Sequence, residues 1–310
     1  MLRNQSRSFL LGAAACWGLG TVLTKQALGG FTPEVLLPLQ LLVSVVLLCV
    51  AFLLSRGSLG DVERKAQIAA LGVLNPGVSY ALGLAGLALI DASTSVIIWA
   101  TEPVIITVLA VLVLREHLSA RLVVCLAVAM VGVSLVLSPS MGGDASALGV
   151  LLLFGAVTAC AVYTVLVRMM DLRDGALPVV FLQQASALAF AVVLFLVTSG
   201  GGAGAPQDGP SVGEWTAALT GGVLYYGLAF LFYVAALKRT TASAAGVSLT
   251  LIPVFGLAFS VLLLGESLNL AQVVGSVLVI GSMAALALGS RSVTDERIEA
   301  ADRAVPRRAT

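Results

Sequence analysis

The chain of 310 residues is far too apolar for a water-soluble protein of its size. Hydrophobic residues make up 59% of it, charged residues only 11%, and the formal net charge is +1. A globular domain carries about 25% charged and about 45–50% apolar residues, so the excess apolar surface faces lipid. The basic residues are scattered singly, which excludes a surface built for nucleic acid.

The cysteines and the single histidine point to neither a disulfide framework nor a metal site. All four cysteines lie inside apolar runs, and no CxxC spacing occurs. Zinc sites and disulfide-rich folds need clustered or regularly spaced ligands. We therefore expect no metal and no cofactor, and the lack of any nucleophile–base pair argues against an enzyme.

Apolar runs long enough to form membrane helices follow one another along the chain. A helix needs about 20 mainly apolar residues to cross the hydrocarbon core. Ten such runs can be placed, at residues 9–27, 35–54, 68–89, 92–114, 122–137, 147–167, 178–198, 215–237, 242–264 and 271–288. The sequence thus predicts an all-α integral membrane protein with ten transmembrane helices.

The charges of the loops predict how these helices are oriented. Cytoplasmic loops collect Lys and Arg. With the N-terminus inside, all but one of the 17 basic residues fall on the cytoplasmic side, including those of segment 1–8 and of the tail 289–310. The exception, Lys25, either reaches the outer headgroups or binds a substrate carboxylate.

The chain also matches itself in two halves. Near the start of each half the offset is 143 residues, and further on it is 150. The matches include Thr21-Val22-Leu23 with Thr164-Val165-Leu166, Gly72-Val73-Leu74 with Gly222-Val223-Leu224, Ala92-Ser93 with Ala242-Ser243, Pro103 with Pro253, and Glu116 with Glu266. We predict two five-helix repeats, over 9–138 and 147–288. Because five is odd the second repeat is inverted, an arrangement common in secondary transporters.

With ten spans and two halves, the chain resembles the drug/metabolite transporter superfamily, EamA type. The residues that carry the resemblance run from Glu102-Pro103 to Glu116 in the first half and from Pro253 to Glu266 in the second. The resemblance implies a bacterial inner-membrane exporter. Its central cavity would be lined by the first, third and fourth spans of each half. Members carry amino acids, other metabolites or drugs, so the substrate stays open.

Glu102 is the residue for which the sequence makes the most specific chemical prediction. It lies about eleven residues into the run 92–114, near the bilayer centre, where a carboxylate is costly and commonly serves as a proton or substrate-amine site. The other interpretation is a protonated Glu that bonds a neighbouring helix. Proton antiport through Glu102 is one mechanism, and uncoupled facilitated flux is its rival.

Aromatic and polar residues recur at helical spacing on the spans around Glu102. Such stripes either line a cavity, where rings hold an ammonium group by cation–π attraction, or serve as contacts between helices. The predicted substrate-binding residues are Trp17, Thr21, Asn75, Ser79, Tyr80, Trp99, Glu102, Tyr163, Tyr226 and Phe230, with Tyr233 on the stripe of the last two. The deep spans lack Lys and Arg, which disfavours phosphorylated substrates.

Several other intramembrane residues are predicted to have structural roles. Gln40 and Gln184 either read a substrate or join helices. Glycines at positions 83, 86, 275 and 281 suit close helix packing. Glu116 and Glu266 end their spans, and we interpret them as caps or loop-closing residues and not as gates.

The function predicted from the sequence is export of amino acids or similar small amphipathic metabolites by alternating access. Its partners would be the solute, the lipid bilayer and, if transport is coupled, protons. Efflux of organic cations is the alternative from the same fold. A receptor or scaffold that moves no solute is a third possibility, which the internal repeat disfavours.

Overall fold

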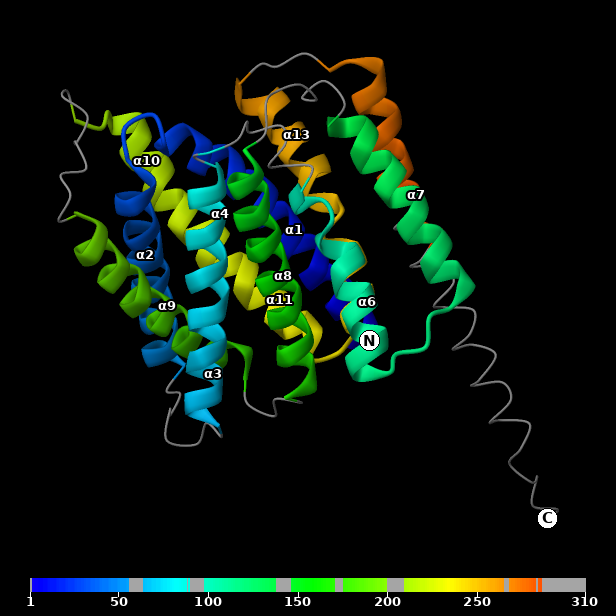
Figure 1. Ribbon diagram of the computed structural model, residues 1–310, viewed down its shortest axis with the longest axis horizontal. Coiled ribbons are helices and arrows are strands. Elements are labelled where there is room, and N and C mark those ends of the chain that lie inside the picture. Colours follow the sequence, from blue (N-terminus) through cyan, green and yellow to red (C-terminus); the bar gives the residue numbers. More distant parts are fainter. Residues whose placement is uncertain are drawn as a thin grey trace.

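The computed structural model in Figure 1 is a bundle of helices that lie roughly side by side. It describes residues 2–55, 64–87, 89, 98–137, 146–170, 175–199, 209–264, 268–282 and 284–285. Within these ranges the regular structure is helical, with no strand. The predicted all-α fold is therefore confirmed.

The first half begins with two long helices and continues with a series of shorter ones. Its elements are α1 (Leu2–Ala27), α2 (Pro33–Leu54), α3 (Lys65–Gly72), η1 (Val73–Val78), α4 (Ser79–Leu87), α6 (Glu102–Leu114) and α7 (Ala120–Leu137). Pro33 begins α2, at a position where its missing N–H is no loss and its fixed φ suits the helix. The elements α3, η1 and α4 together form the predicted third span.

The second half has the same order of long and short elements. They are α8 (Ala147–Met169), α9 (Ala176–Ser199), α10 (Val212–Gly221), η3 (Gly222–Leu228), α11 (Ala229–Leu237), α12 (Ala242–Ser248), α13 (Leu251–Leu264) and a last helix, Leu270–Ser282. Ser211 and Glu214 start α10 with a capping box, in which each side chain accepts a hydrogen bond from the backbone N–H of the other, a strong helix-start signal.

Among the described residues, seven helical stretches are long and apolar enough to cross a membrane. They correspond to the predicted first, second, third, sixth, seventh, eighth and ninth spans. Three shorter apolar helices, α6, α7 and Leu270–Ser282, occupy the places of the predicted fourth, fifth and tenth spans. The chain is thus a multi-pass membrane protein.

Two spans predicted as single helices differ in the structure: in one the described helix begins later than predicted, and the other is interrupted by a turn. The run 92–114 contains α6, which starts only at Glu102, while residues 90–97 lie outside the described residues. The run 242–264 is divided into α12 and α13 by a turn at Leu249 and Thr250. Pro103 and Pro253 explain both starts, because a proline lacks the N–H that a helix interior needs and fits in a first turn.

The third span of each half changes its winding at matching places. Segments η1 and η3 are π-helical, and the 150-residue offset aligns their starts to within one residue. Inside η1, Asn75 leaves helical geometry altogether, with φ −147° and ψ 119°, as expected for a residue that precedes a proline. π-Helical turns of this kind are frequent at functional sites.

The halves contact each other reciprocally. Helix α1 packs against α10, η3, α11 and α13, while α8 packs against η1, α4 and α6. The first helix of each half therefore lies on the third and fourth spans of the other half. Helix α2 packs on α9, and α7 lies beside the last helix at one edge of the bundle (Figure 1), where Gly132 faces Gly275.

Glycines bring the second and third spans of opposite halves into backbone contact. A Cβ on Gly72 would meet the backbone of Gln183 in α9, and one on Gly222 would lie 2.8 Å from the Gln40 carbonyl oxygen in α2. The close-packing role expected of Gly86 and Gly275 is confirmed by similar approaches to backbone, and a Cβ on Gly83 would lie 3.1 Å from the Trp99 side chain. For Gly281 that expectation is wrong, because nothing in the described part of the chain lies within 4 Å of its would-be Cβ.

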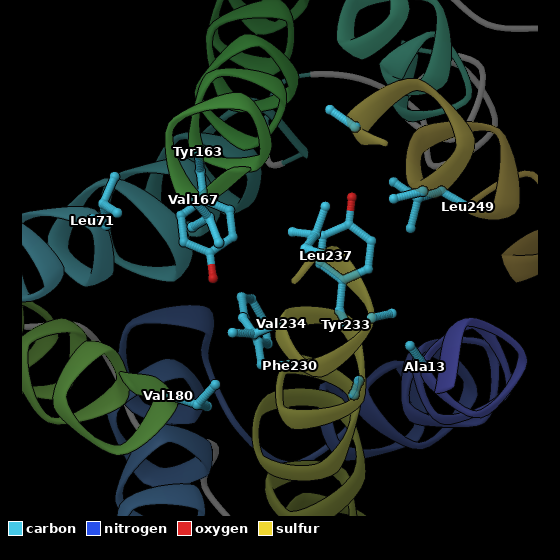
Figure 2. Close-up of a cluster of buried hydrophobic side chains, with 14 of the residues drawn as sticks. Ala13, Leu71, Tyr163, Val167, Val180, Phe230, Tyr233, Val234, Leu237 and Leu249 are labelled. Atoms are coloured by element: carbon cyan, nitrogen blue, oxygen red, sulfur yellow. The ribbon is translucent and has the colours of Figure 1, made fainter. Parts of the chain in front are cut away.

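The largest buried cluster lies where α1, α8, α9, α11 and α12 converge. Figure 2 shows Tyr163 of α8 and Phe230 and Tyr233 of α11 between Ala13 of α1, Val180 of α9 and Leu249 at the end of α12. Both halves therefore contribute to one core. The predicted substrate-binding residues lie on the helices that surround it.

Candidate substrate site

The six aromatic residues predicted to bind substrate form one connected cluster. The ring centroid of Tyr80 lies 6.1 Å from that of Trp99, 5.4 Å from that of Tyr226 and 6.5 Å from that of Phe230. Phe230 in turn is 5.5 Å from Trp17 and 6.2 Å from Tyr163. These separations are those of edge-to-face and tilted aromatic pairs. Helices of both halves thus contribute rings to one cluster, called here the aromatic cluster.

Two further tyrosines complete the aromatic cluster. Tyr233 lies 5.2 Å from Trp17, with its hydroxyl 3.1 Å from that of Thr164, as its place on the predicted stripe suggests. The ring centroid of Tyr225 lies 5.6 Å from that of Tyr80 and 5.2 Å from that of Tyr226.

Sequence reasoning missed Tyr225. Adjacent residues of a regular α-helix point about 100° apart, so Tyr225 falls off the stripe that runs through Tyr226 and Phe230. The π-helical winding of η3 changes this register and brings both tyrosines against Tyr80. The Tyr-Tyr pair and the flanking glycines were the only available signal.

Glu102 stands at the first position of α6, directly after the Thr101 N-cap. A helix N-terminus favours a negative charge, which gives this carboxylate a favourable place in the fold. It is half-buried and lies within electrostatic range of Cys160, Tyr225 and Tyr233. No side chain among the described residues donates a hydrogen bond to it or forms an ion pair with it. The carboxylate is therefore available to a ligand or a proton.

Asn75 and Ser79, in contrast, form a closed polar group. The Ser79 hydroxyl donates to Asn75 Oδ1 at 2.6 Å, and the Cys160 thiol of α8 approaches the same oxygen at 3.5 Å. Both residues are buried. They join the break in the third span to α8, and this contact satisfies the Asn75 carbonyl oxygen.

Exposure divides the predicted site into a sealed part and an accessible part. Four of the residues are buried: Trp17, Tyr163, Tyr226 and Phe230. The side chains of Tyr163 and Phe230 are each only 1% exposed. Tyr80, Trp99 and Glu102 are half-buried, and Thr21 is exposed, with its hydroxyl donating to the Trp17 carbonyl at 2.8 Å. These four residues are the part of the predicted site that is not fully buried, and are called here the accessible edge of the aromatic cluster.

The remaining intramembrane candidates hold helices together. Gln40 donates to Thr24 at 3.1 Å, and Gln184 donates to the Tyr226 carbonyl at 2.9 Å. Tyr163, although part of the aromatic cluster, donates its hydroxyl to Gln183 at 3.0 Å. The helix-joining alternative is thus confirmed for the two predicted glutamines.

The charged residues at the ends of helices are also placed. Lys25 is exposed in the last turn of α1. Glu116 caps a helix, as expected, but that helix is α12 of the other half, whose first backbone N–H groups bond the carboxylate. Glu266 lies outside the described residues.

Two segments of the chain match the same family model. The model of the EamA-like transporter family matches residues 7–138 and again residues 147–288. The chain belongs to the EamA-like transporter family. The resemblance to the drug/metabolite transporter superfamily is therefore confirmed, and the protein is a membrane transporter by family.

Individual relatives of this EamA-like transporter agree with that assignment. An uncharacterized transporter of Clostridium kluyveri is 22% identical over 223 residues, which cover 70% of each chain. A crystal structure of a protein that is 19% identical aligns with a TM-score of 0.79 over 94% of this chain and 99% of that one. The second similarity establishes a shared fold.

Proposed function

We propose that this EamA-like transporter exports amino acids or similar small amphipathic metabolites across the inner membrane of a bacterium by alternating access. In this proposal the chain crosses the membrane ten times, as two inverted five-helix repeats over residues 9–138 and 147–288. The double family match and the reciprocal contacts between the halves support the repeat. Inverted repeats give two equivalent conformations around one central site.

The observation that carries the substrate class is the half-buried carboxylate of Glu102, which has no partner among the described residues, together with half-buried aromatic rings. Tyr80 and Trp99 share the accessible edge with it. A carboxylate and ring faces are the two groups that bind an ammonium ion in a low-dielectric site. A solute with one amino group and an apolar or aromatic body matches both.

The charges of the loops support an orientation in the membrane, and Glu102 supports a form of coupling. Both termini are proposed to lie in the cytoplasm, because the loops predicted to face it hold nearly all Lys and Arg. A proton on Glu102 would alternate with the solute's amine, since the carboxylate cannot bind a proton and the ammonium group at the same time. Uncoupled flux through the same site is the mechanistic rival.

Substrate binding and exchange by the purified protein test this proposal. Thermal unfolding is followed across a panel of amino acids and organic cations, and each hit is then assayed by counterflow in proteoliposomes. A ligand at about 100 times its Kd adds about 2.7 kcal/mol to stability, enough for a clear shift. We expect hits among neutral and aromatic amino acids that also exchange.

A matched pair of tryptophan variants locates the binding site. Trp99→Leu removes a ring at the accessible edge. Trp215→Leu removes one that packs on Phe31 at the start of the eighth span. We expect Trp99→Leu alone to weaken binding, by about fivefold if a cation–π contact of about 1 kcal/mol is lost. Equal effects of the two variants would refute the assignment of the site.

Efflux of organic cations is the second candidate function. The Glu102 carboxylate, which has no partner among the described residues, and the half-buried rings favour it as much as they favour amines. Hits restricted to lipophilic quaternary ammonium compounds would select it over amino-acid export. A protein that moves no solute from either class would overturn both proposals.

A further inference from the structure

Helix α12 is buried along most of its length, with Ala244 alone of its residues half-buried. Ala242, Ala245 and Val247 are 0% exposed, and Ser243 and Ser248 are also buried. The helix packs mainly against α6 and also contacts α1, α7, α8 and α11. An ordinary span of this bundle shows one face to lipid, whereas α12 fills the space between the two halves.

Helix α12 separates the aromatic cluster from one end of the molecule. At its C-terminal end, Leu249 packs in the same buried cluster as Phe230 and Tyr233 (Figure 2). Its N-terminal end follows Lys238 and Arg239 in the chain and lies near Arg115 and Glu116. Helix α12 thus lies between the aromatic cluster and this basic end.

Glu116 accepts hydrogen bonds from the N-terminal end of α12. Its Oε1 accepts from the Ala242 N–H at 2.9 Å, and its Oε2 accepts from the Ser243 N–H at 3.2 Å and from the Ser243 hydroxyl at 2.6 Å. A carboxylate that accepts several bonds at a helix start makes a strong, charge-assisted contact. It joins residues 126 positions apart, one from each half.

The rest of α12 is built to move as a unit. Its residues are small, and Ile106 of α6 lies against Gly246, so close that a Cβ there would be 2.8 Å from a methyl group. The turn at Leu249 and Thr250 separates it from α13. Displacing α12 therefore leaves α13 intact.

We propose that α12 is a gate at the basic end of the transporter and that Glu116 is the latch that keeps it closed. The inference rests on the proposed alternating access, because only such a cycle requires this end to open. When the gate opens, the three hydrogen bonds to Glu116 break and α12 leaves the space between the halves. In the conformation described here α12 is buried and bonded to Glu116, so the proposal assigns it to the state in which the basic end is closed.

Labelling of a buried cysteine on α12 tests the latch. Ala245→Cys places a thiol on the buried helix without touching the contacts of Glu116. A water-soluble maleimide is added to the purified full-length protein, and labelling at residue 245 is followed by mass spectrometry, with buried Cys160 as an internal reference. We expect Glu116→Gln to accelerate labelling about tenfold, the effect of losing a charge-assisted hydrogen bond.

Glu214→Gln is the matched control, because Glu214 also caps a helix start but contacts Ser211 and not α12. It should leave the labelling rate at residue 245 unchanged. An unchanged rate in Glu116→Gln, or equal acceleration in both variants, would overturn the latch. If Ala245→Cys does not fold, Ser248→Cys, a near-isosteric change on the same buried helix, takes its place.

The labelling experiment needs no substrate, so it separates the latch from the proposed function. Accelerated labelling in a protein that transports no amino acid or cation would overturn the substrate proposal and support the gate. Transport of a panel solute with no acceleration by Glu116→Gln would overturn the latch alone.

Discussion

Glu102 and Tyr163 were predicted as members of the same site, but their polar atoms meet different surroundings. The Tyr163 hydroxyl is committed to Gln183 in a buried position. The Glu102 carboxylate has no partner among the described residues and is half-buried. At the scale of single residues, Glu102 is therefore the candidate for solute or proton binding, and Tyr163 supports the fold.

Replacing Glu102 by Gln should impair transport without impairing folding. Gln keeps the shape but loses the charge, so we expect an amine-bearing solute to exchange at least about tenfold more slowly, as for a lost charged hydrogen bond. Under proton antiport the variant also loses the pH response of transport. Counterflow across the neutral pH range measures both.

The control for this variant is Glu34→Gln. Glu34 is an exposed carboxylate in the first turn of α2, so the chemical change is the same. A Glu102→Gln protein that keeps the full rate and the full pH response would remove Glu102 from the mechanism.

Tyr163→Phe should act on stability and not on specificity. The change removes the hydrogen bond that the side-chain oxygen of Gln183 accepts, and the Gln183 amide nitrogen already lacks a partner among the described residues. Interhelical hydrogen bonds in membrane proteins contribute about 0.6 kcal/mol on average, with a maximum of about 1.7. We expect a lower unfolding temperature with unchanged relative affinities across the solute panel. A changed order of affinities would show that Tyr163 meets the solute.

At the scale of elements, the third span of each half is shaped by glycine. Gly72 and Gly222 stand at the boundaries of the π-helical segments, where they let α9 and α2 approach the backbone. Because the two glycines are equivalent under the 150-residue offset, the contact of α3 with α9 and that of η3 with α2 are made close in the same way. A side chain at either position has to push two helices apart.

Gly72→Ala should therefore destabilise the protein. Overpacking a well-packed interior costs typically about 1–3 kcal/mol, and here the would-be Cβ meets backbone, which cannot rotate away. Gly281→Ala is the control, because its Cβ would enter open space; it should be neutral or stabilising by up to about 1 kcal/mol. Thermal unfolding of both variants in one detergent tests the difference, and equal stability would contradict the described α3–α9 packing.

At the scale of the whole molecule, the number of spans decides on which sides the two termini lie. Ten crossings put both termini on one side, whereas the seven longest helices alone would put them on opposite sides. The basic residues favour the first arrangement with both ends inside. The topology thus depends on whether α6, α7 and the last helix cross.

Cysteine labelling in intact cells measures this topology. We expect Val212→Cys, exposed at the start of α10, to react with an impermeant maleimide from outside. Ala120→Cys, exposed at the start of α7, should react only after the cells are permeabilised. A green fluorescent protein fused to the C-terminus should fluoresce. The reverse labelling pattern, or a C-terminus outside, would refute the ten-span proposal.

The sequence by itself determined the membrane class, the all-helical fold, the family and the aromatic residues that meet at the centre. These properties depend on local composition, on helical spacing and on a repeat that can be read along one dimension. The tertiary structure alone decided that Tyr225 joins the aromatic cluster, that Glu102 begins a helix, and that Glu116 caps α12 of the other half. Each of these depends on a change of winding, a helix break or a contact between segments far apart in the chain, which periodicity cannot express.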